Sequence, residues 1–404
     1  MKNRDFVIIS LNPWYTPLSS TSKRVASELA KNNRVLYINP PLDRKTLMTK
    51  HDDPLLQKHL KIIKGMENEM VQIGASFWNY YPKTILESVN WIPSTKVFSW
   101  FNYINNKRIA KYIQAAVESL GFSNYVLIND KDLFRGFYLK ELLHPDVYMY
   151  YDRDYILGVD YWRKHGAELE PKLAGKSDLI VTHSDHLMSL LKPYNKYIYN
   201  VGSGIDVSMF DSKKQYPVPE ELKPVEGPVL GYVGALTSAR LDEEAFLRIA
   251  QERPNWTLAL VGPEDEVFQN STLHSMKNVL FCGRKKIEEI PAYISAMTVC
   301  LNPQVINDIT IGNYPLKIDE YLALGKPVVA TRTIGMRPFE GYVYLAEPYG
   351  DYVSLIEKAI NEDNQLEIQR RISLAHSHSW ECILNNIFEA IKTTKSQHGA
   401  SCQN

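Results

Sequence analysis

The stretch Gly312-Asn-Tyr-Pro-Leu-Lys-Ile-Asp-Glu-Tyr-Leu-Ala-Leu-Gly-Lys-Pro-Val-Val-Ala-Thr331 decides the fold of the second half of this chain. It reads as a loop, a helix that carries Glu320, and a short β-branched strand at Val328 to Ala330. Helices that alternate with such strands are typical of a doubly wound α/β sheet. The backbone N–H groups of Leu316 and Lys317 open the helix, where the helix dipole favours an anion. The stretch therefore predicts a phosphate-binding helix N-terminus in an α/β domain.

Similar short apolar runs recur along the whole chain, with helical segments between most of them. In the second half the further predicted strands are Val229 to Val233, Thr257 to Val261, Val279 to Cys282, Val299 to Leu301 and Val343 to Leu345. In the first half they are Phe6 to Ser10, Arg34 to Asn39, Tyr125 to Ile128, Val147 to Tyr151 and Leu179 to Thr182. A chain of 404 residues exceeds what one hydrophobic core usually serves. We therefore expect an α/β protein with two Rossmann-like domains that face a cleft.

The boundary between the two domains is expected between Pro193 and Pro228. Gly202, Gly204 and the polar, proline-containing run from Lys213 to Gly227 interrupt the periodicity there. We take residues 1–205 as the N-terminal domain and residues 206–375 as the C-terminal domain.

The composition excludes several classes of protein. Lys plus Arg equals Asp plus Glu at 46 each, so the chain has no net positive charge that would attract nucleic acid. The four cysteines lack metal-ligand or redox spacing and read as reduced thiols of a cytosolic protein. The N-terminus lacks the features of a signal peptide. The sequence also has no run of about 18 consecutive apolar residues, which is the length needed to span a bilayer. We therefore expect a cytoplasmic protein whose membrane contact, if it has one, is peripheral.

The alternation of strands and helices breaks between Lys45 and Ile113, which indicates an insertion or a distorted part of the sheet. This stretch is rich in aromatic residues: Phe77, Trp78, Tyr80, Tyr81, Trp91, Phe98, Trp100, Phe101 and Tyr103. We favour packing of these side chains in the core over their exposure on a surface that contacts an acceptor or a membrane, because aromatic side chains are mostly buried.

Polar residues that follow predicted strands are the candidates for chemistry, because open α/β sheets bind ligands beyond the carboxyl ends of their strands. Asp152 follows the strand that ends at Tyr151, and we expect it to contact an acceptor hydroxyl. The competing interpretation is a salt bridge between Arg153 and a carboxylate at the strand end. Gly234 to Arg240 forms the turn after another strand and is a further candidate on the same rule.

Several segments together resemble the donor-binding domain of glycosyltransferase family 4 and its relatives, which have the GT-B fold. The resemblance rests on the opening stretch and on Tyr232-Val-Gly234, Leu260-Val-Gly-Pro263, Phe281-Cys-Gly-Arg284 and Asn200-Val-Gly-Ser-Gly-Ile-Asp206. Ser377-His-Ser-Trp-Glu381 resembles the start of the terminal helix that crosses back to the first domain, so residues 376–404 are taken as this helix and a polar tail. The resemblance is convincing over residues 200 to 390 and rests on layout before them.

The resemblance implies that Glu320 holds the ribose hydroxyls of a nucleotide-sugar donor. Lys317 is expected to stabilise negative charge on the leaving nucleoside diphosphate, or alternatively to be a solvated lysine. Arg240 is a second candidate phosphate contact, because the family has a basic residue in this region. The donor site is predicted to comprise Gly234, Arg284, Asn313, Tyr314, Leu316, Lys317 and Glu320, and the catalytic residues to be Asp152, Lys317 and Arg240. One departure is that Gly312 stands where the family has a Glu that contacts the transferred sugar.

The sequence thus predicts transfer from a nucleotide sugar to a saccharide or lipid-linked acceptor, with retention and without a metal or another cofactor. Surface polysaccharide or glycolipid assembly is the expected context. The alternatives are a nucleotide-sugar epimerase of the same fold and a non-catalytic nucleotide-sugar binding protein, which the missing Glu keeps open. A nicotinamide-dependent oxidoreductase is disfavoured because Asn12-Pro-Trp-Tyr-Thr-Pro17 replaces the Gly-x-Gly-x-x-Gly turn after the first strand.

Overall fold

The chain folds into two compact α/β units. The computed structural model describes residues 1–16, 20–49, 54–348 and 350–401. Unit 1 consists of residues 1–202 together with residues 383–404, and unit 2 consists of residues 203–382. Every strand predicted from the sequence is present, with its ends displaced by at most two residues.

The chain crosses between the units at 202/203 and at 382/383, whereas the sequence analysis placed the divisions at 205/206 and 375/376. The second crossing lies later because residues 376–382 still pack on unit 2. The indole of Trp380 covers Gly204, where an added Cβ would lie 2.3 Å from the ring. A parallel bridge also joins Ile205 to Ser379.

Unit 1 is built on an eight-stranded sheet in the order β10-β9-β8-β7-β1-β2-β5-β4. Neighbouring strands run parallel except β4 and β5, which are antiparallel. The central strands are buried on both faces, which is why they read as nearly continuous apolar runs. The strands are β1 (Asp5–Ser10), β2 (Arg34–Ile38), β4 (Met70–Gly74), β5 (Phe77–Tyr80), β7 (Val126–Asp130), β8 (Val147–Asp152), β9 (Leu179–Thr182) and β10 (Ile198–Asn200).

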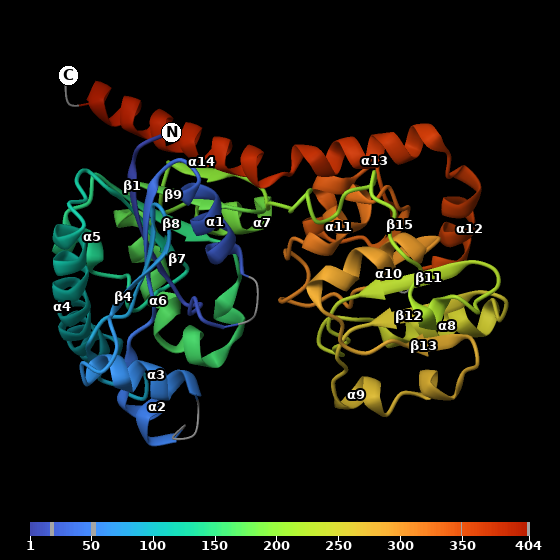
Figure 1. The fold of residues 1–404 in the computed structure, drawn as a ribbon, viewed down its shortest axis with the longest axis horizontal. Helices are drawn as coiled ribbons and strands as arrows, with labels where there is room; N and C mark the ends of the chain where they lie inside the picture. The colour runs from blue at the N-terminus through green and yellow to red at the C-terminus, as the bar shows by residue number, and fades with distance from the viewer. Residues whose placement is uncertain (17–19, 50–53, 349, 402–404) are drawn as a thin grey trace. The chain divides into compact units, whose positions relative to one another are not determined.

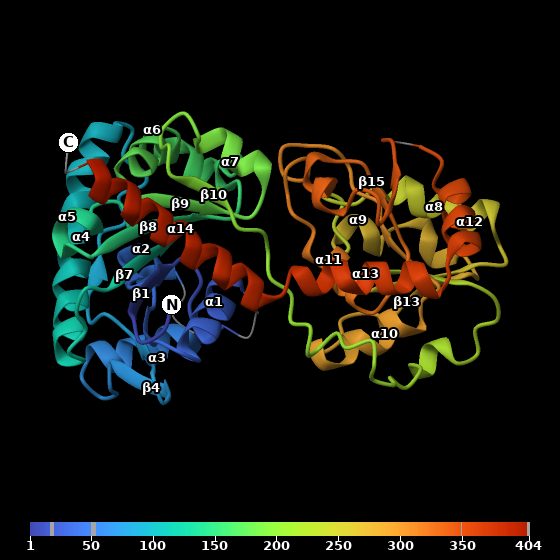
Figure 2. The same ribbon diagram turned by 90° about the horizontal axis from the view of Figure 1, so that it is seen from above.

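Helices cover both faces of this sheet (Figure 1). One face packs against α4 (Thr95–Ser119), α5 (Leu139–Leu143), α6 (Asp160–Lys176) and α7 (Asp185–Leu191). The other face packs against α1 (Thr21–Ala30) and the terminal helix α14 (Trp380–Ser401). The rings of Phe6 on β1 and Phe388 on α14 lie 6.3 Å apart, so the terminal helix returns to unit 1 as predicted (Figure 2).

The stretch that interrupts the pattern in unit 1 adds a two-stranded sheet and two helices beside the main sheet. They are β3 (Leu42–Asp43), β6 (Ile85–Leu86), α2 (Arg44–Thr49) and α3 (Pro54–Ile63). Some of its aromatic residues pack in the core and others are exposed on the surface. Phe77, Tyr81 and Phe98 are buried, whereas Trp91 and Trp100 are 73% and 60% exposed.

Unit 2 is a parallel six-stranded sheet in the order β13-β12-β11-β14-β15-β16. Its strands are β11 (Val229–Val233), β12 (Thr257–Val261), β13 (Val279–Phe281), β14 (Val299–Asn302), β15 (Val328–Thr331) and β16 (Tyr344–Ala346). One face packs against α10 (Ile290–Ala296), α11 (Leu316–Ala323) and α13 (Gln365–Ser377). The other packs against α8 (Glu243–Glu252), α9 (Glu266–Gln269) and α12 (Tyr352–Glu362). Both units are therefore doubly wound, as the sequence predicts.

Short 3₁₀ turns complete the fold: η1 (Ile156–Gly158), η2 (Glu220–Leu222), η3 (Thr272–Ser275), η4 (Ile287–Glu289) and η5 (Ile334–Phe339). Over the described ranges, no helix has both the length and the apolar composition that crossing a membrane requires.

Candidate functional site

Unit 2 has a topological switch point between β11 and β14. From β11 the sheet continues through β12 and β13 on one side, and through β14, β15 and β16 on the other. In open α/β sheets, ligands bind beyond the carboxyl ends of the strands at such a point. Gly234 directly follows β11, and the loop after β14 leads into the first turn of α11. Four of the predicted donor residues, Gly234, Leu316, Lys317 and Glu320, therefore belong to this edge of the sheet.

The backbone at Gly234 and Gly262 is packed too closely for side chains. A Cβ added at Gly262 would lie 1.8 Å from the carbonyl oxygen of Gly234. A Cβ added at Gly234 would lie 2.8 Å from Nζ of Lys317. Their φ angles of +145° and +154° also favour glycine. The two strand ends thus meet below the Lys317 ammonium group.

Lys317 lies against Tyr232, which is the penultimate residue of β11. Its Nζ donates a hydrogen bond to the Tyr232 hydroxyl and lies 3.9 Å from the centre of that ring. The contact combines a hydrogen bond with a cation–π interaction, so it orients the ammonium group toward the glycine turn. Lys317 is half-buried rather than fully solvated.

The N-terminus of α11 lacks a side-chain cap. The residue at its N-cap position is Pro315, which has no side-chain acceptor. No hydrogen bond to the backbone N–H of Leu316 or Lys317 is found among the described residues. Such N–H groups, together with the helix dipole, are what a phosphate group binds at a helix N-terminus.

Glu320 lies one turn into α11 and is half-buried. Burial raises its pKa to about 7, Lys317 acts in the opposite direction, and neighbouring Asp319 adds to the increase. Within the described parts of the chain no group donates a hydrogen bond to its carboxylate. A carboxylate that is costly to bury and has no donor is typical of a ligand site.

Replacement of Glu320 with glutamine is expected to stabilise the free protein at pH 8 by about 1–3 kcal/mol, since one pKa unit corresponds to about 1.4 kcal/mol. The folded state binds the Glu320 proton more tightly than the unfolded state does. The wild type is therefore most stable relative to Glu320→Gln near pH 4, and the advantage of the variant grows as the pH rises from 4.5 to about 7. Urea unfolding at pH 4.5, 6 and 8 measures this difference. A variant less stable than wild type at pH 8 would show that Glu320 is a structural residue.

Tyr314 was predicted to bind the donor, but its side chain points into the core of unit 2. Its hydroxyl donates to Asp319 Oδ2 over 2.6 Å, and His378 Nδ1 lies 2.7 Å from Asp319 Oδ1. Burial raises the pKa of Asp319, which His378 and Tyr314 partly counter. Because the hydroxyl of Tyr314 is occupied by Asp319, this side chain gives no support to donor binding, which stays a prediction for Tyr314. The cluster instead fastens α11 to the end of α13.

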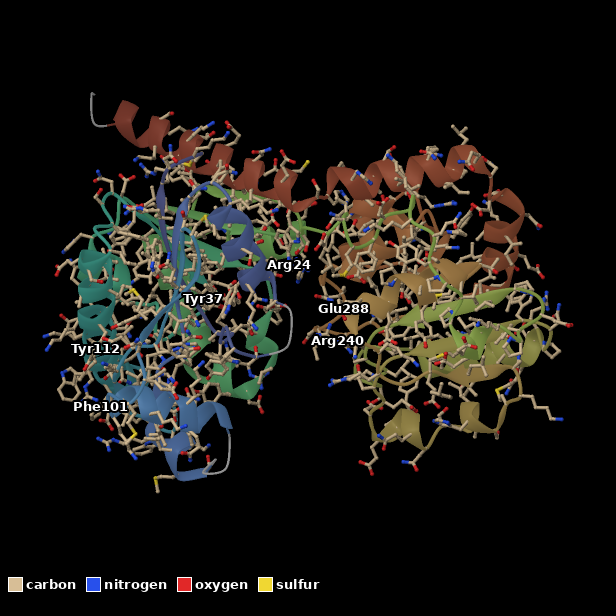
Figure 3. The ribbon with its side chains drawn as sticks, in the orientation of Figure 1. Arg24, Tyr37, Phe101, Tyr112, Arg240 and Glu288 are labelled. Carbon is tan, nitrogen blue, oxygen red and sulfur yellow. The ribbon has the colours of Figure 1, made fainter. Side chains whose placement is uncertain are left out.

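Three further predicted residues lie on loops around this edge. Arg240 is on the surface of unit 2 (Figure 3), and its carbonyl oxygen accepts from Val305 N over 3.1 Å. This bond ties its loop to the one that leads to α11. Asn313 is half-buried, and a Cβ at Gly335 would lie 2.2 Å from its carbonyl oxygen. Arg284 is exposed after β13. The structure joins Lys317 to Gly234 but gives no contact that joins Arg284 to them.

Asp152, predicted to contact an acceptor, is buried at the end of β8 and only 1% exposed. Its carboxylate pairs with Nζ of Lys131, which also lies 2.6 Å from Glu170. The Tyr150 hydroxyl donates to the same Glu170 oxygen over 2.7 Å. Burial raises the pKa of Asp152 to about 7, against the opposing effect of Lys131. The predicted acceptor contact is therefore not supported, because the carboxylate is enclosed and already paired.

The competing interpretation of a strand-end salt bridge is confirmed for Arg153. Its Nε lies 2.6 Å from Asp130 Oδ1, and it also pairs with Asp154. Ser10 donates to Asp130 over 2.6 Å, which links the ends of β1 and β7. These polar groups hold the carboxyl edge of the unit 1 sheet together.

Sequence reasoning missed several polar residues at these edges. Tyr232 was read only as part of a strand, and Lys131 was not considered. Asn302, Gln304 and Thr333 are buried at the ends of β14 and β15, each with a polar side-chain atom that has no hydrogen-bond partner among the described residues. Such atoms are rare in native proteins and need an explanation. The available signal was their position directly after apolar strands.

No group of three or more His, Cys, Asp or Glu side chains in the described parts of the chain is arranged to hold a metal ion. The three described cysteines are unpaired.

Comparison with known proteins agrees with the resemblance seen in the sequence. Residues 227–361 match the family described as Glycosyl transferases group 1. The chain is 28% identical to a protein of Bacillus subtilis (strain 168) named as teichuronic acid biosynthesis glycosyltransferase TuaH, over 57% of this chain. The match spans 60% of the length of that relative.

Solved structures share the fold over nearly the whole chain. Trehalose 6-phosphate synthase from Burkholderia multivorans has a TM-score of 0.64 at 11% identity, covering 99% of this chain and 98% of its own. Sucrose-phosphate synthase from Thermosynechococcus elongatus has a TM-score of 0.60 at 15% identity, with 100% of both chains covered. Anabaena HepE in complex with UDP has a TM-score of 0.60 at 14% identity, covering 96% of this chain and 100% of its own. At these identities the likeness shows the fold alone.

Proposed function

Since unit 2 carries a glycosyl transferases group 1 domain within a GT-B fold, we propose that this chain is a glycosyltransferase that uses a nucleotide-sugar donor. The observation that carries the proposal is the grouping of Lys317, Gly234 and the uncapped first turn of α11 at the switch point of the unit 2 sheet. This grouping supplies N–H donors and a cation for a diphosphate.

The donor lies with its diphosphate against the N–H groups of Leu316 and Lys317 and its ribose hydroxyls on Glu320. The Glu320 carboxylate suits this task because it has acceptor capacity and no donor of its own in the described structure. Hydroxyl donors from the ribose recover part of the cost of burying the charge. Arg284 and the turn after β13 lie beside the nucleotide base.

The sugar of the donor is recognised without the carboxylate that the family has at the position of Gly312. Neutral polar side chains supply the contacts in its place. Gln304 and Thr333 support this role, because each is buried beside the carboxyl edge with an oxygen that lacks a partner in the described structure. Asn313, on the loop before α11, is a further contributor.

Bond cleavage at the donor anomeric carbon places negative charge on the departing diphosphate. Lys317 stabilises that charge, and Arg240 adds to it from the neighbouring loop. The acceptor hydroxyl loses its proton to the departing phosphate, so transfer proceeds with retention and needs neither a covalent nucleophile nor a metal ion. Stabilisation of developing charge by fixed cations and N–H groups supports such a mechanism.

The acceptor is a saccharide or a lipid-linked saccharide held by unit 1. The relation to a protein named for teichuronic acid biosynthesis supports a role in assembling a surface polysaccharide. The proposal puts the enzyme in the cytoplasm, in peripheral contact with the inner membrane where a lipid-linked acceptor is presented.

A thermal-shift panel of UDP, GDP, ADP, their sugar conjugates and NAD tests the donor site. At about 100 times its Kd, the right nucleotide should stabilise the fold by about 2.7 kcal/mol, which raises the Tm by roughly 5 °C or more. We expect one nucleoside diphosphate to give this shift on wild type and on Glu252→Ala, an exposed control on α8. Glu320→Ala should lose most of it. A shift with NAD alone, or with none of the compounds, would contradict the proposal.

A further inference from the structure

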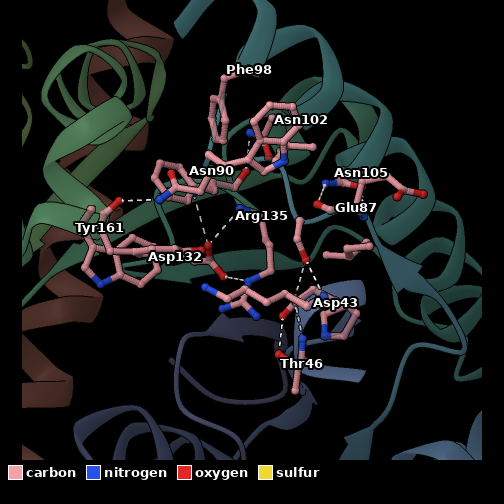
Figure 4. Close-up of a pocket in the computed structure, with 18 of the residues that line it drawn as sticks. Asp43, Thr46, Glu87, Asn90, Phe98, Asn102, Asn105, Asp132, Arg135 and Tyr161 are labelled. Atoms are coloured by element: carbon pink, nitrogen blue, oxygen red, sulfur yellow. Dashed lines mark hydrogen bonds and ion pairs between the residues drawn. The ribbon is translucent and has the colours of Figure 1, made fainter. Parts of the chain in front are cut away.

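Unit 1 contains a cavity of about 610 Å³ that lies at the carboxyl edge of its own sheet (Figure 4). Leu11, which follows β1, and Asp132, which follows β7, both line it. The strand order reverses between β1 and β7, so the cavity adjoins the switch point of this sheet. The other walls come from the β3–β6 insertion, from α4 and from the start of α6. This position is where an open α/β sheet binds a ligand, and every residue that lines the cavity belongs to unit 1.

Aromatic rings form one wall of the cavity. Phe134 packs against Trp162 with ring centres 5.2 Å apart, and Tyr161 meets Trp162 edge to face at 5.0 Å. Two of the lining aromatic side chains remain open to solvent: Trp91 is 73% exposed and Tyr161 is 52% exposed. Aromatic rings that line a cavity and stay exposed offer an apolar face to a ligand.

Fixed carboxylates and an amide form the polar part of the cavity. Asp132 is held by Arg135 at 2.5 Å, and Asp43 accepts from the hydroxyls of Thr46 and Ser88 at 2.7 and 2.6 Å. The bonds from Thr46 and Ser88 outweigh burial and keep the pKa of Asp43 below its ordinary value, so it is an acceptor at neutral pH.

The amide of Asn90 adds an unused acceptor. Its Nδ2 donates to the carbonyl oxygen of Tyr161 over 3.0 Å, while its Oδ1 is buried and has no donor among the described residues. A buried acceptor without a donor is costly, and a ligand hydroxyl removes that cost. Asn90 lines the cavity beside Tyr161 (Figure 4).

We infer that this cavity binds a sugar ring of the acceptor, with the ring face on Trp91 and Tyr161 and its hydroxyls on Asp43 and Asn90. A pyranose presents a face of C–H groups, which suits the negative face of an aromatic ring, and a rim of hydroxyl donors, which suits fixed oxygen acceptors. A lipid chain would leave the Asn90 oxygen without a donor. The charged side chains that line the cavity are three acids, Asp43, Glu87 and Asp132, and three bases, Lys45, Arg135 and Lys164, so the lining has no net positive charge to attract a diphosphate. The inference rests on the proposed function only in identifying the bound sugar as the acceptor of the transfer.

Direct sugar binding tests the inference apart from any transfer activity. The probes are maltose, lactose, N,N′-diacetylchitobiose and methyl glucuronide, titrated by saturation-transfer NMR against wild type, Trp91→Ala and Trp100→Ala. Trp100 is the matched control, because it is 60% exposed on α4 but does not line the cavity. We expect at least one probe to bind wild type and Trp100→Ala equally, and to bind Trp91→Ala about tenfold more weakly. The donor-induced thermal shift should be the same in all three proteins.

A second variant, Asn90→Ala, should also weaken sugar binding, and an unchanged Tm would show that it folds. The inference is overturned if no probe binds wild type, or if Trp91→Ala binds as tightly as Trp100→Ala. Loss of the nucleotide response with sugar binding intact would instead overturn the proposed function and leave the sugar site in place.

Discussion

Lys317→Met is expected to lower the turnover of the donor about 10²–10³-fold, which is the effect of removing one group that stabilises developing negative charge. The ammonium group is held by Tyr232 and lies beside Gly234, so methionine keeps the length of the side chain but removes the charge. Nucleotide affinity should fall less than kcat, because the charge on the diphosphate grows as the bond to the sugar breaks. Release of nucleoside diphosphate, by transfer or by slow hydrolysis, measures the effect.

The control is Lys277→Met, which removes an exposed lysine of unit 2. It should keep kcat within about twofold. The Tm of Lys317→Met should stay within a few degrees of wild type, because a cation–π contact at a partly exposed site is worth only about 0.5–1 kcal/mol. If Lys317→Met raised KM and left kcat unchanged, Lys317 would be a binding residue without a role in the chemical step.

Lys131→Met is expected to lower the free energy of unfolding by about 3–5 kcal/mol, as the loss of one partner of a buried ion pair does. Lys131 is 2% exposed and is the shared partner of Asp152 and Glu170. Burial alone would lower its pKa, but the two carboxylates outweigh burial and raise it. Without the ammonium group these carboxylates face each other in the interior. Urea unfolding at pH 7.5 measures the change.

Lys140→Met provides the comparison, because its pair with Asp178 is partly exposed and should contribute about 1 kcal/mol or less. Addition of Asp152→Asn to Lys131→Met should recover part of the stability by removing one buried charge. An effect of Lys131→Met no larger than that of Lys140→Met would contradict the buried network.

Two residues predicted as catalytic, one in each unit, differ in their exposure to ligands. Asp152 and Lys317 were both predicted as catalytic because each follows a strand or opens a helix at a carboxyl edge. Asp152 is enclosed by Lys131, a residue 21 positions earlier that β7 brings beside it. Lys317 keeps its position at the edge because its neighbour, Gly234, has no side chain. The sequence contains the residue types, but their exposure depends on strands that pair across long sequence separations.

The donor-site predictions also differ in whether local sequence or distant residues decide them. The helix from Leu316, its Glu320 and the glycine turn at Gly234 follow from local pattern and resemblance. The inward position of Tyr314 does not, because its hydroxyl binds Asp319 on α11 and lies close to His378 at the end of α13.

By itself the sequence determined the two doubly wound units, the position of nearly every strand, and the return of the terminal helix. These depend on hydrophobic periodicity and on glycine and proline at element ends, which act over a few residues. Only the tertiary structure decided which polar side chains are buried with partners and which are left open, and it alone formed the unit 1 cavity from β1, β7, α4 and α6. The physical reason is that desolvation and ion pairing depend on what lies within a few ångströms, and most of those neighbours are distant in sequence.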